Sequence, residues 1–153
     1  MKKYLSVSVV AVLCSLVSCK DEYTICTLSK DVKFIAGFYQ SQNTPAPAPQ
    51  LSVSILNTNA FIYTNQGNVA EMGFGLNSTL DSNRYVITIA GNLPKDTVTI
   101  RYSSQTSNLS LECGSITTNT INSISSTHHT IDSIKITNAT CNNTPIQNAR
   151  IFY

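Results

Sequence analysis

Apolar and polar residues alternate along most of the chain after residue 31, in short runs separated by turn-forming residues. A period of two places one side of an extended strand on a core and the other side in solvent. The apolar members of these runs lie within 32–38, 51–55, 72–76, 85–89, 98–102, 109–113, 134–136 and 149–153. The pattern predicts seven to nine short strands, and no segment has a helical period.

Turn signals separate these runs at 65–68, 81–83, 91–94 and 141–145. Short strands at this spacing are typical of an all-β fold, and we expect a single antiparallel β-sandwich of Greek-key, immunoglobulin-like type. A small β-barrel is the alternative. The proline-rich segment 44–49 predicts a stiff loop between the first two strands, because proline cannot donate to a central sheet ladder.

The first eighteen residues do not follow the strand pattern. Two lysines precede an uncharged apolar run over 5–17, which is too short to span a bilayer and is typical of a signal peptide. The run ends in Leu16-Val17-Ser18-Cys19, which resembles the lipobox of bacterial lipoproteins. This resemblance implies cleavage between Ser18 and Cys19 and acyl chains, palmitate among them, on Cys19. An ordinary secretory signal with an incidental cysteine is the alternative.

The residues after Cys19 refine the expected location. Lys20-Asp21-Glu22 resembles the lipoprotein export signal of Bacteroidota. This resemblance implies an outer-membrane lipoprotein exposed at the cell surface, with a periplasm-facing one as the alternative. We therefore expect a signal peptide over 1–18, a lipidated N-terminus and tether over 19–29, and the β-sandwich domain over 30–153.

The composition supports an extracytoplasmic β domain and excludes a nucleic-acid binder. Without the two lysines of the leader, eight basic residues balance eight acidic ones, so the mature chain has no basic patch of the required strength. Serine, threonine and asparagine supply 48 of the 135 residues from Cys19 onward, and all three disfavour helix interiors. The expected partners are the membrane, through the lipid anchor on Cys19, and an unknown envelope protein or glycan.

Candidate catalytic chemistry is sparse. His128 and His129 are the only histidines, and no cysteine or further histidine stands at a metal-ligand spacing, so a solvated turn is the favoured interpretation. Cys113 beside a histidine would resemble a thiol-protease dyad, but its apolar neighbours Leu109 and Leu111 favour a buried, inert sulfur. The carboxylates are scattered singly. We expect no cofactor, no metal and a non-enzymatic binding or structural module, with an envelope hydrolase as the alternative.

Two three-residue patterns indicate a covalent modification. Asp96-Thr97-Val98 and Asp132-Ser133-Ile134 resemble the sequon for O-glycosylation in Bacteroidota, which is an aspartate, a hydroxyl residue and an aliphatic residue. Thr97 and Ser133 fall on the polar sides of their predicted strands. They are the candidate glycan acceptors.

Several short motifs recur in a fixed order along the mature chain. They are an early cysteine (Cys26), the strand 96–102, the pair Cys113-Gly114, the segment 131–138 and the ending 149–153. This order resembles domain-of-unknown-function family 6452, a family of small lipoproteins of Bacteroidota. The chain departs from the family pattern at 74–76 and at Ser115. Since the family has no assigned activity, the resemblance implies a location and no reaction.

The mature fold retains three cysteines, Cys26, Cys113 and Cys141, and an odd number leaves one thiol over. In the resembled family the early cysteine recurs with the one of the Cys-Gly pair. The resemblance therefore implies a Cys26–Cys113 disulfide with Cys141 free in an Asn-rich turn. A Cys113–Cys141 disulfide is the alternative.

We predict that Cys19→Ala abolishes acylation and membrane fractionation while leaving the mature domain able to fold, because the strand pattern begins only after residue 31. Fractionation and mass spectrometry of the N-terminal peptide measure both effects. Cys14→Ala, within the leader, is the matched control and should change neither. A Cys19→Ala protein that stays firmly membrane-bound would contradict the lipobox interpretation.

Overall fold

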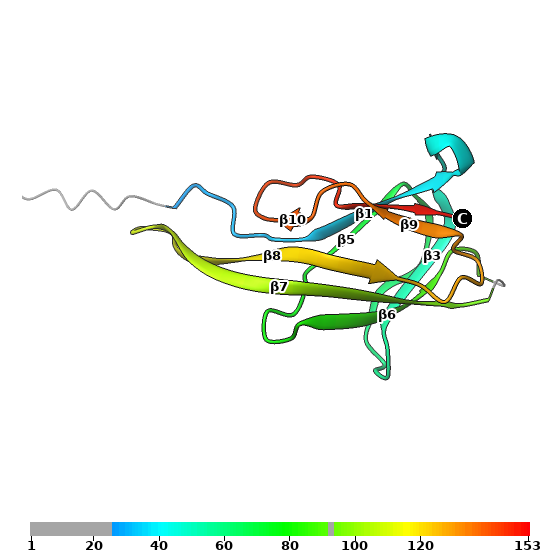
Figure 1. Cartoon of the computed structure of the whole chain (residues 1–153), viewed down its shortest axis with the longest axis horizontal. Helices are drawn as coiled ribbons and strands as arrows, with labels where there is room; N and C mark the ends of the chain where they lie inside the picture. The colour runs from blue at the N-terminus through cyan, green and yellow to red at the C-terminus, as the bar shows by residue number, and fades with distance from the viewer. Residues whose placement is uncertain (1–25, 92–93) are drawn as a thin grey trace, which may run out of the picture.

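The computed structural model describes residues 26–91 and 94–153, which form a β-sandwich (Figure 1). The predicted signal peptide 1–18, Cys19 and the tether up to residue 25 lie outside the described residues. The elements are β1 (Phe34–Gln40), a 3-10 turn η1 (Ser41–Asn43), β2 (Thr44–Pro45), β3 (Ala48–Ile55), β4 (Phe61–Val69), β5 (Glu71–Phe74), β6 (Ser82–Thr88), β7 (Asp96–Ser110), β8 (Gly114–Ser125), β9 (Ser133–Ile136), β10 (Thr140–Cys141) and β11 (Ala149–Phe152). No helix in this part of the chain is both long and apolar enough to cross a bilayer.

The strands form two sheets, which confirms the predicted all-β sandwich. One sheet has the order β2-β1-β11-β9, with β5 on the same edge of β1 as β2, and the other has the order β10-β8-β7-β6-β3-β4. The pair β1–β11 is parallel, whereas the other pairs among the described residues are antiparallel. The described residues contain eleven strands where seven to nine were predicted, and five of them, β2, β5, β9, β10 and β11, have only two to four residues.

The core lies between the sheets and consists mainly of the inward members of the predicted alternation, joined by Val69, Ile121 and Ile131 from outside the predicted runs. Its largest fully buried side chains are Phe34, Phe38, Leu51, Val53, Met72, Tyr85, Ile87, Ile89, Ile100, Tyr102, Ile131 and Ile151. The rings of Phe74 and Tyr85 lie 4.4 Å apart between their centroids and join the two sheets. Each large apolar side chain buried in this way contributes about 1.5–3 kcal/mol of transfer free energy.

The buried side chain of Asn148 holds the start of β1 against the end of the chain. Its Oδ1 accepts the Ile35 N–H at 2.9 Å, and its Nδ2 donates to the carbonyls of Asn138 and Thr140 at 3.1 and 2.9 Å. The Asn148 backbone N–H also donates to the Ile35 carbonyl. The amide therefore pairs backbone groups that lie where the regular ladders stop, and an unpaired buried group would be costly there.

The predicted turn over 65–68 is wrong, because these residues lie inside β4. Asn65 and Asn68 have φ of 47° and 54°, and the pairing of β4 with β3 shifts register near Leu51 and Val53. Asparagine tolerates this left-handed conformation better than most residues. At the sheet edge, the strand absorbs these residues as bulges and continues.

The proline-rich segment is also more ordered than a loop. Thr44–Pro45 forms β2 at the edge of one sheet, and β3 begins at Ala48 in the other. Pro49 is the second residue of β3, near the start of the strand, where a proline interrupts the ladder least. The segment thus carries the chain from one sheet to the other.

The prediction that Leu109 and Leu111 face the core is wrong. β7 and β8 continue beyond Tyr102 as a long hairpin, and residues 103–108 of β7 are exposed. Leu111 lies in the turn of this hairpin and is fully exposed, whereas Leu109 is half-buried. Over 103–108 β7 therefore has no buried side, whereas β8 opposite it still buries Ile116 and Asn119.

The structure contains the disulfide Cys26–Cys113, the pairing that the resemblance implied. Among the described residues Cys141 is the free cysteine, and it lies in β10 rather than in a turn, with its sulfur in the core. Burial raises the pKa of the Cys141 thiol to about 11, so it is protonated and unreactive at neutral pH.

Replacing Cys26 and Cys113 together by serine should lower the free energy of unfolding by about 4 kcal/mol, because the bond closes a long loop in the unfolded chain. The sequence separation is 87 residues. Urea unfolding in a Cys141→Ala background measures this without thiol exchange. Non-reducing peptide mapping that links Cys141 to Cys26 or Cys113 would contradict the pairing.

Candidate functional site

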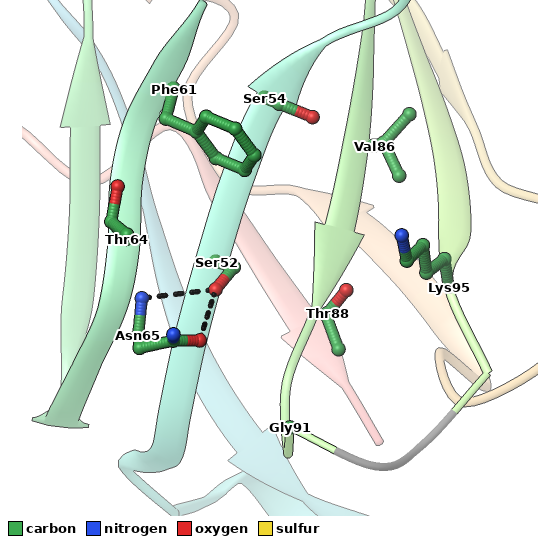
Figure 2. Close-up of a pocket in the computed structure, with 9 residues that line it drawn as sticks. All are labelled: Ser52, Ser54, Phe61, Thr64, Asn65, Val86, Thr88, Gly91 and Lys95. Atoms are coloured by element: carbon green, nitrogen blue, oxygen red, sulfur yellow. Dashed lines mark hydrogen bonds between the residues drawn. The ribbon is translucent and has the colours of Figure 1, made fainter. Parts of the chain in front are cut away.

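An open groove of about 320 Å³ lies on the outer face of the six-stranded sheet (Figure 2). It crosses β4, β3 and β6 and extends to the segment between β6 and β7. The residues that line it are Ser52, Ser54, Phe61, Thr64, Asn65, Val86, Thr88, Gly91 and Lys95. This volume is at the lower end of the range for small-molecule sites.

The polar lining from β3 and β6 follows directly from strand alternation. Leu51 and Val53 of β3 are buried in the core, so Ser52 and Ser54 point to the opposite face of the sheet. Thr88 of β6 lines the groove for the same reason, because Ile87 and Ile89 beside it are buried. The core and the groove are therefore the two faces of the same strands.

Bulges in β4 add consecutive residues to the same groove. Between the pairs Leu51–Gln66 and Val53–Tyr63, β4 has one residue more than β3, and Thr64 and Asn65 both line the groove. The Ser52 hydroxyl donates to Asn65 Oδ1 at 3.0 Å, and the Asn65 N–H donates to Ser52 Oγ at 3.0 Å (Figure 2). These bonds hold the Asn65 side chain across the groove floor.

Several polar groups in the groove are available to a ligand. The hydroxyls of Ser54, Thr64 and Thr88 make no hydrogen bond with other residues that the structure describes; Thr64 is exposed, Ser54 is half-buried and Thr88 is 9% exposed. The Phe61 side chain is 62% exposed and reaches from β4 toward β3 over the groove (Figure 2). Lys95 is the one charged residue among the nine that line the groove, and none of the nine is a carboxylate.

A second depression of about 290 Å³ lies beside the proline-rich segment, but its polar groups already pair with one another. The Tyr39 hydroxyl donates to Gln147 Oε1 at 3.1 Å, and Gln147 Nε2 donates to Glu71 Oε1 at 2.7 Å. The Arg150 guanidinium lies 4.9 Å from the centre of the Tyr39 ring. This arrangement indicates a structural network.

The histidines lie in the loop between β8 and β9, as predicted, and a buried carboxylate holds this loop. Asp96 accepts the N–H groups of His129, Thr130 and Ile131 at 2.7, 2.7 and 2.9 Å, and the Thr127 hydroxyl at 2.8 Å. Burial alone would raise the pKa of Asp96, but these four donors outweigh it and lower the pKa to about 2. Asp96 is therefore an ionised anchor for the loop.

The same loop does not form a hydrolytic triad. His129 Nδ1 lies 3.4 Å from Asp96 Oδ1 and 3.0 Å from Thr127 Oγ1, so one ring nitrogen contacts both groups. A triad needs the acid and the nucleophile on opposite nitrogens of the ring. Cys113 is in a disulfide and cannot act as a thiol nucleophile. No group of three or more potential metal ligands occurs in the described ranges.

The other predicted site residues are dispersed. Ser133 is exposed in β9, whereas Thr97 is half-buried in β7, and its N–H donates to the Thr127 hydroxyl at 3.0 Å. Glycosylation at either residue stays a prediction. The predicted cleavage site, Ser18–Cys19, lies outside the described residues.

A family model matches the chain over residues 50–153, and its description is a family of unknown function, DUF6452. The chain belongs to DUF6452. The match covers β4 to β11 and all of β3 except its first two residues, and so includes every residue that lines the groove. No curated protein and no solved structure matches this DUF6452 chain.

Sequence reasoning missed the groove. Ser52 and Ser54 were visible as the polar members of a strand, but Phe61, Thr64 and Asn65 lie in a strand that the turn signal at 65–68 concealed. The apolar stretch Phe61-Ile62-Tyr63 was the signal that could have indicated it.

Asp96 should make the domain less stable in acid. The pKa of Asp96 is about 2 in the folded chain and 3.8 in the unfolded chain, so its ionised form stabilises the fold by about 2 kcal/mol at pH values above 3.8. This contribution is lost as the pH falls from 3.8 toward about 2. Asp96→Asn should remove the contribution at neutral pH and flatten the dependence between pH 4 and 2, as urea unfolding at several pH values would show. Asp132→Asn, an exposed carboxylate next to the loop, is the control. Equal stability of Asp96→Asn and wild type at pH 7 would contradict this role.

Proposed function

We propose that this DUF6452 chain is a lipid-anchored, non-enzymatic binding module of the cell envelope, and that its groove binds a neutral glycan. The lipid on Cys19 would hold it on the outer membrane at the cell surface. The lining of the groove is the main support for the binding role. Hydroxyl and amide side chains surround one exposed phenyl ring there.

The chemistry of the lining suits a sugar. Sugar hydroxyls both donate and accept hydrogen bonds, and the free hydroxyls of Ser54, Thr64 and Thr88 do the same. The exposed ring of Phe61 offers an apolar surface to the C–H face of a pyranose. A groove with a single charge favours a neutral ligand, to whose hydroxyl oxygens the Lys95 ammonium can donate hydrogen bonds.

Hydrolysis of a glycan has less support than binding. Most glycosidases use two carboxyl groups on either side of the scissile bond. None of the nine lining residues has one, and Asp96 is 1% exposed with its oxygens occupied by the loop.

Binding of a protein by strand addition is disfavoured at the same place. β4 is an edge of the six-stranded sheet and would be the docking strand. Its bulges and the left-handed residues Asn65 and Asn68 interrupt the regular row of backbone donors and acceptors that strand addition requires. The groove beside it can still hold a ligand that does not need that row.

An array of neutral envelope polysaccharides, followed by calorimetry with the glycan that binds, tests the proposal. Phe61→Ala should weaken binding about tenfold, or about 1.4 kcal/mol, and Ser54→Ala should weaken it less. Leu80→Ala, at a residue that is 50% exposed and outside the groove, is the matched control for the loss of apolar surface. Failure of every glycan to bind, or full affinity of Phe61→Ala, would refute the proposal.

A further inference from the structure

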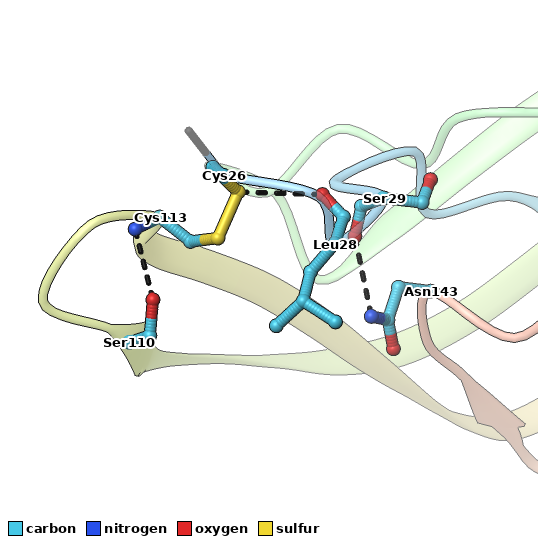
Figure 3. Close-up of a disulfide and its surroundings, with 6 residues drawn as sticks. All are labelled: Cys26, Leu28, Ser29, Ser110, Cys113 and Asn143. Atoms are coloured by element: carbon cyan, nitrogen blue, oxygen red, sulfur yellow. Dashed lines mark hydrogen bonds between the residues drawn. A yellow bond between two sulfur atoms is a disulfide. The ribbon is translucent and has the colours of Figure 1, made fainter. Parts of the chain in front are cut away.

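The turn of the β7–β8 hairpin holds a leucine fully in solvent. Leu111 is 100% exposed, the largest exposure among the large apolar residues of the described chain. The turn itself is ordered, because the Cys113 N–H donates to Ser110 Oγ at 2.9 Å and Gly114 closes it with a φ of 69° (Figure 3). Leu111 is thus presented outward by a turn that a local hydrogen bond holds.

This turn lies beside the beginning of the described chain. The Cys26–Cys113 disulfide brings the two Cα atoms within 4.9 Å, two residues from Leu111 (Figure 3). Leu28, which follows Cys26 closely, is 49% exposed, and the Lys30 ammonium lies next to Gly114. Two exposed leucines and a lysine therefore gather at one end of the molecule.

That end is opposite the end that carries the C-terminus (Figure 1). β7 runs from Asp96 to Ser110 at the hairpin turn, so Lys95, which lines the groove and directly precedes β7, lies at the other end of that strand from Leu111. The exposed leucines and the groove are consequently separated along the length of the sandwich.

Only residues 20–25 lie between Cys26 and Cys19 in the sequence. An extended segment of this length spans at most about 20 Å. Since the disulfide fixes Cys26 to the turn, a lipid on Cys19 would hold Cys26 about one tether length from the bilayer, and the turn that carries Leu111 would lie close to Cys26.

We infer that the β7–β8 turn is a membrane-contacting tip, in which Leu111 and Leu28 enter the interfacial layer of the bilayer that holds the anchor. This inference rests on the lipid anchor of the proposed function. Lys30 beside the turn suits the phosphates of the headgroups. Glu112 follows Leu111 directly, and a carboxylate in hydrocarbon is costly. Glu112 therefore limits the insertion of the turn to the interfacial layer. The contact would direct the groove away from the membrane.

Fluorescence tests this contact, because the sequence contains no tryptophan. Leu111→Trp is made in the full lipidated chain and reconstituted into phosphatidylcholine–phosphatidylglycerol vesicles, with and without a lipid that carries a nitroxide near the top of its acyl chain. The nitroxide should quench the emission of the Leu111→Trp protein by about half, and this emission should be blue-shifted, as for an indole in the interface. Phe61→Trp in the groove is the matched control and should be quenched by less than about a tenth.

Flotation of the same vesicles distinguishes a failure of the membrane-contacting tip from a failure of the lipid anchor. A Leu111→Trp protein that floats with the vesicles while its emission is unquenched overturns the membrane-contacting tip and leaves the anchor standing. Equal quenching of the Leu111→Trp and Phe61→Trp proteins also overturns it, because the domain would then lie on the membrane without a preferred end. A full chain that does not float overturns the anchor and, with it, the tip.

Discussion

The burial of one face of each sheet against the other is the constraint on which the rest of this structure depends. Leu51 and Val53 of β3 pack in the same core as Phe34 and Phe38 of β1, and the disulfide that the described residues form, Cys26–Cys113, lies outside the strands of this core. Because neighbouring residues of a strand point to opposite faces, this packing also sets which side chains face outward. A slip of one residue in β3 would move Ser52 into the core and Leu51 into the groove, so the core enforces the register of the candidate site.

The features with functional interest lie where this alternation stops. In β4, bulges place the neighbours Thr64 and Asn65 on the same groove, which a regular strand could not do. In the β7–β8 hairpin, the strands run past the opposite sheet, so Leu111 is free of any packing role. The first departure is a change in strand pairing and the second is a loss of burial along a strand that stays paired to its turn.

Buried polar groups fix the loops that apolar packing leaves unspecified. Apolar contacts are non-directional and do not select one path for a loop. The carboxylate of Asp96 and the amide of Asn148 instead bind particular backbone groups at definite distances, the first in the β8–β9 loop and the second near β10 and β11. Asp96 is the first residue of the motif 96–102, on which the family resemblance partly rests. The hydrogen bonds that its carboxylate accepts explain why this position is acidic.

The sequence by itself determined the fold class and most of the core. The period-two positions of 32–38, 51–55, 85–89 and 98–102 are buried nearly as predicted, because strand alternation is a local property of the chain. The disulfide was implied only through the resemblance. Tertiary structure decided the rest. Asn65 has the local signature of a turn, yet pairing with β3 keeps it within a strand, and Leu111 has the signature of a core residue, yet no opposing layer covers it. Whether a position is a turn, a bulge, a core or an exposed tip depends on which distant strand lies beside it, and no local pattern contains that information.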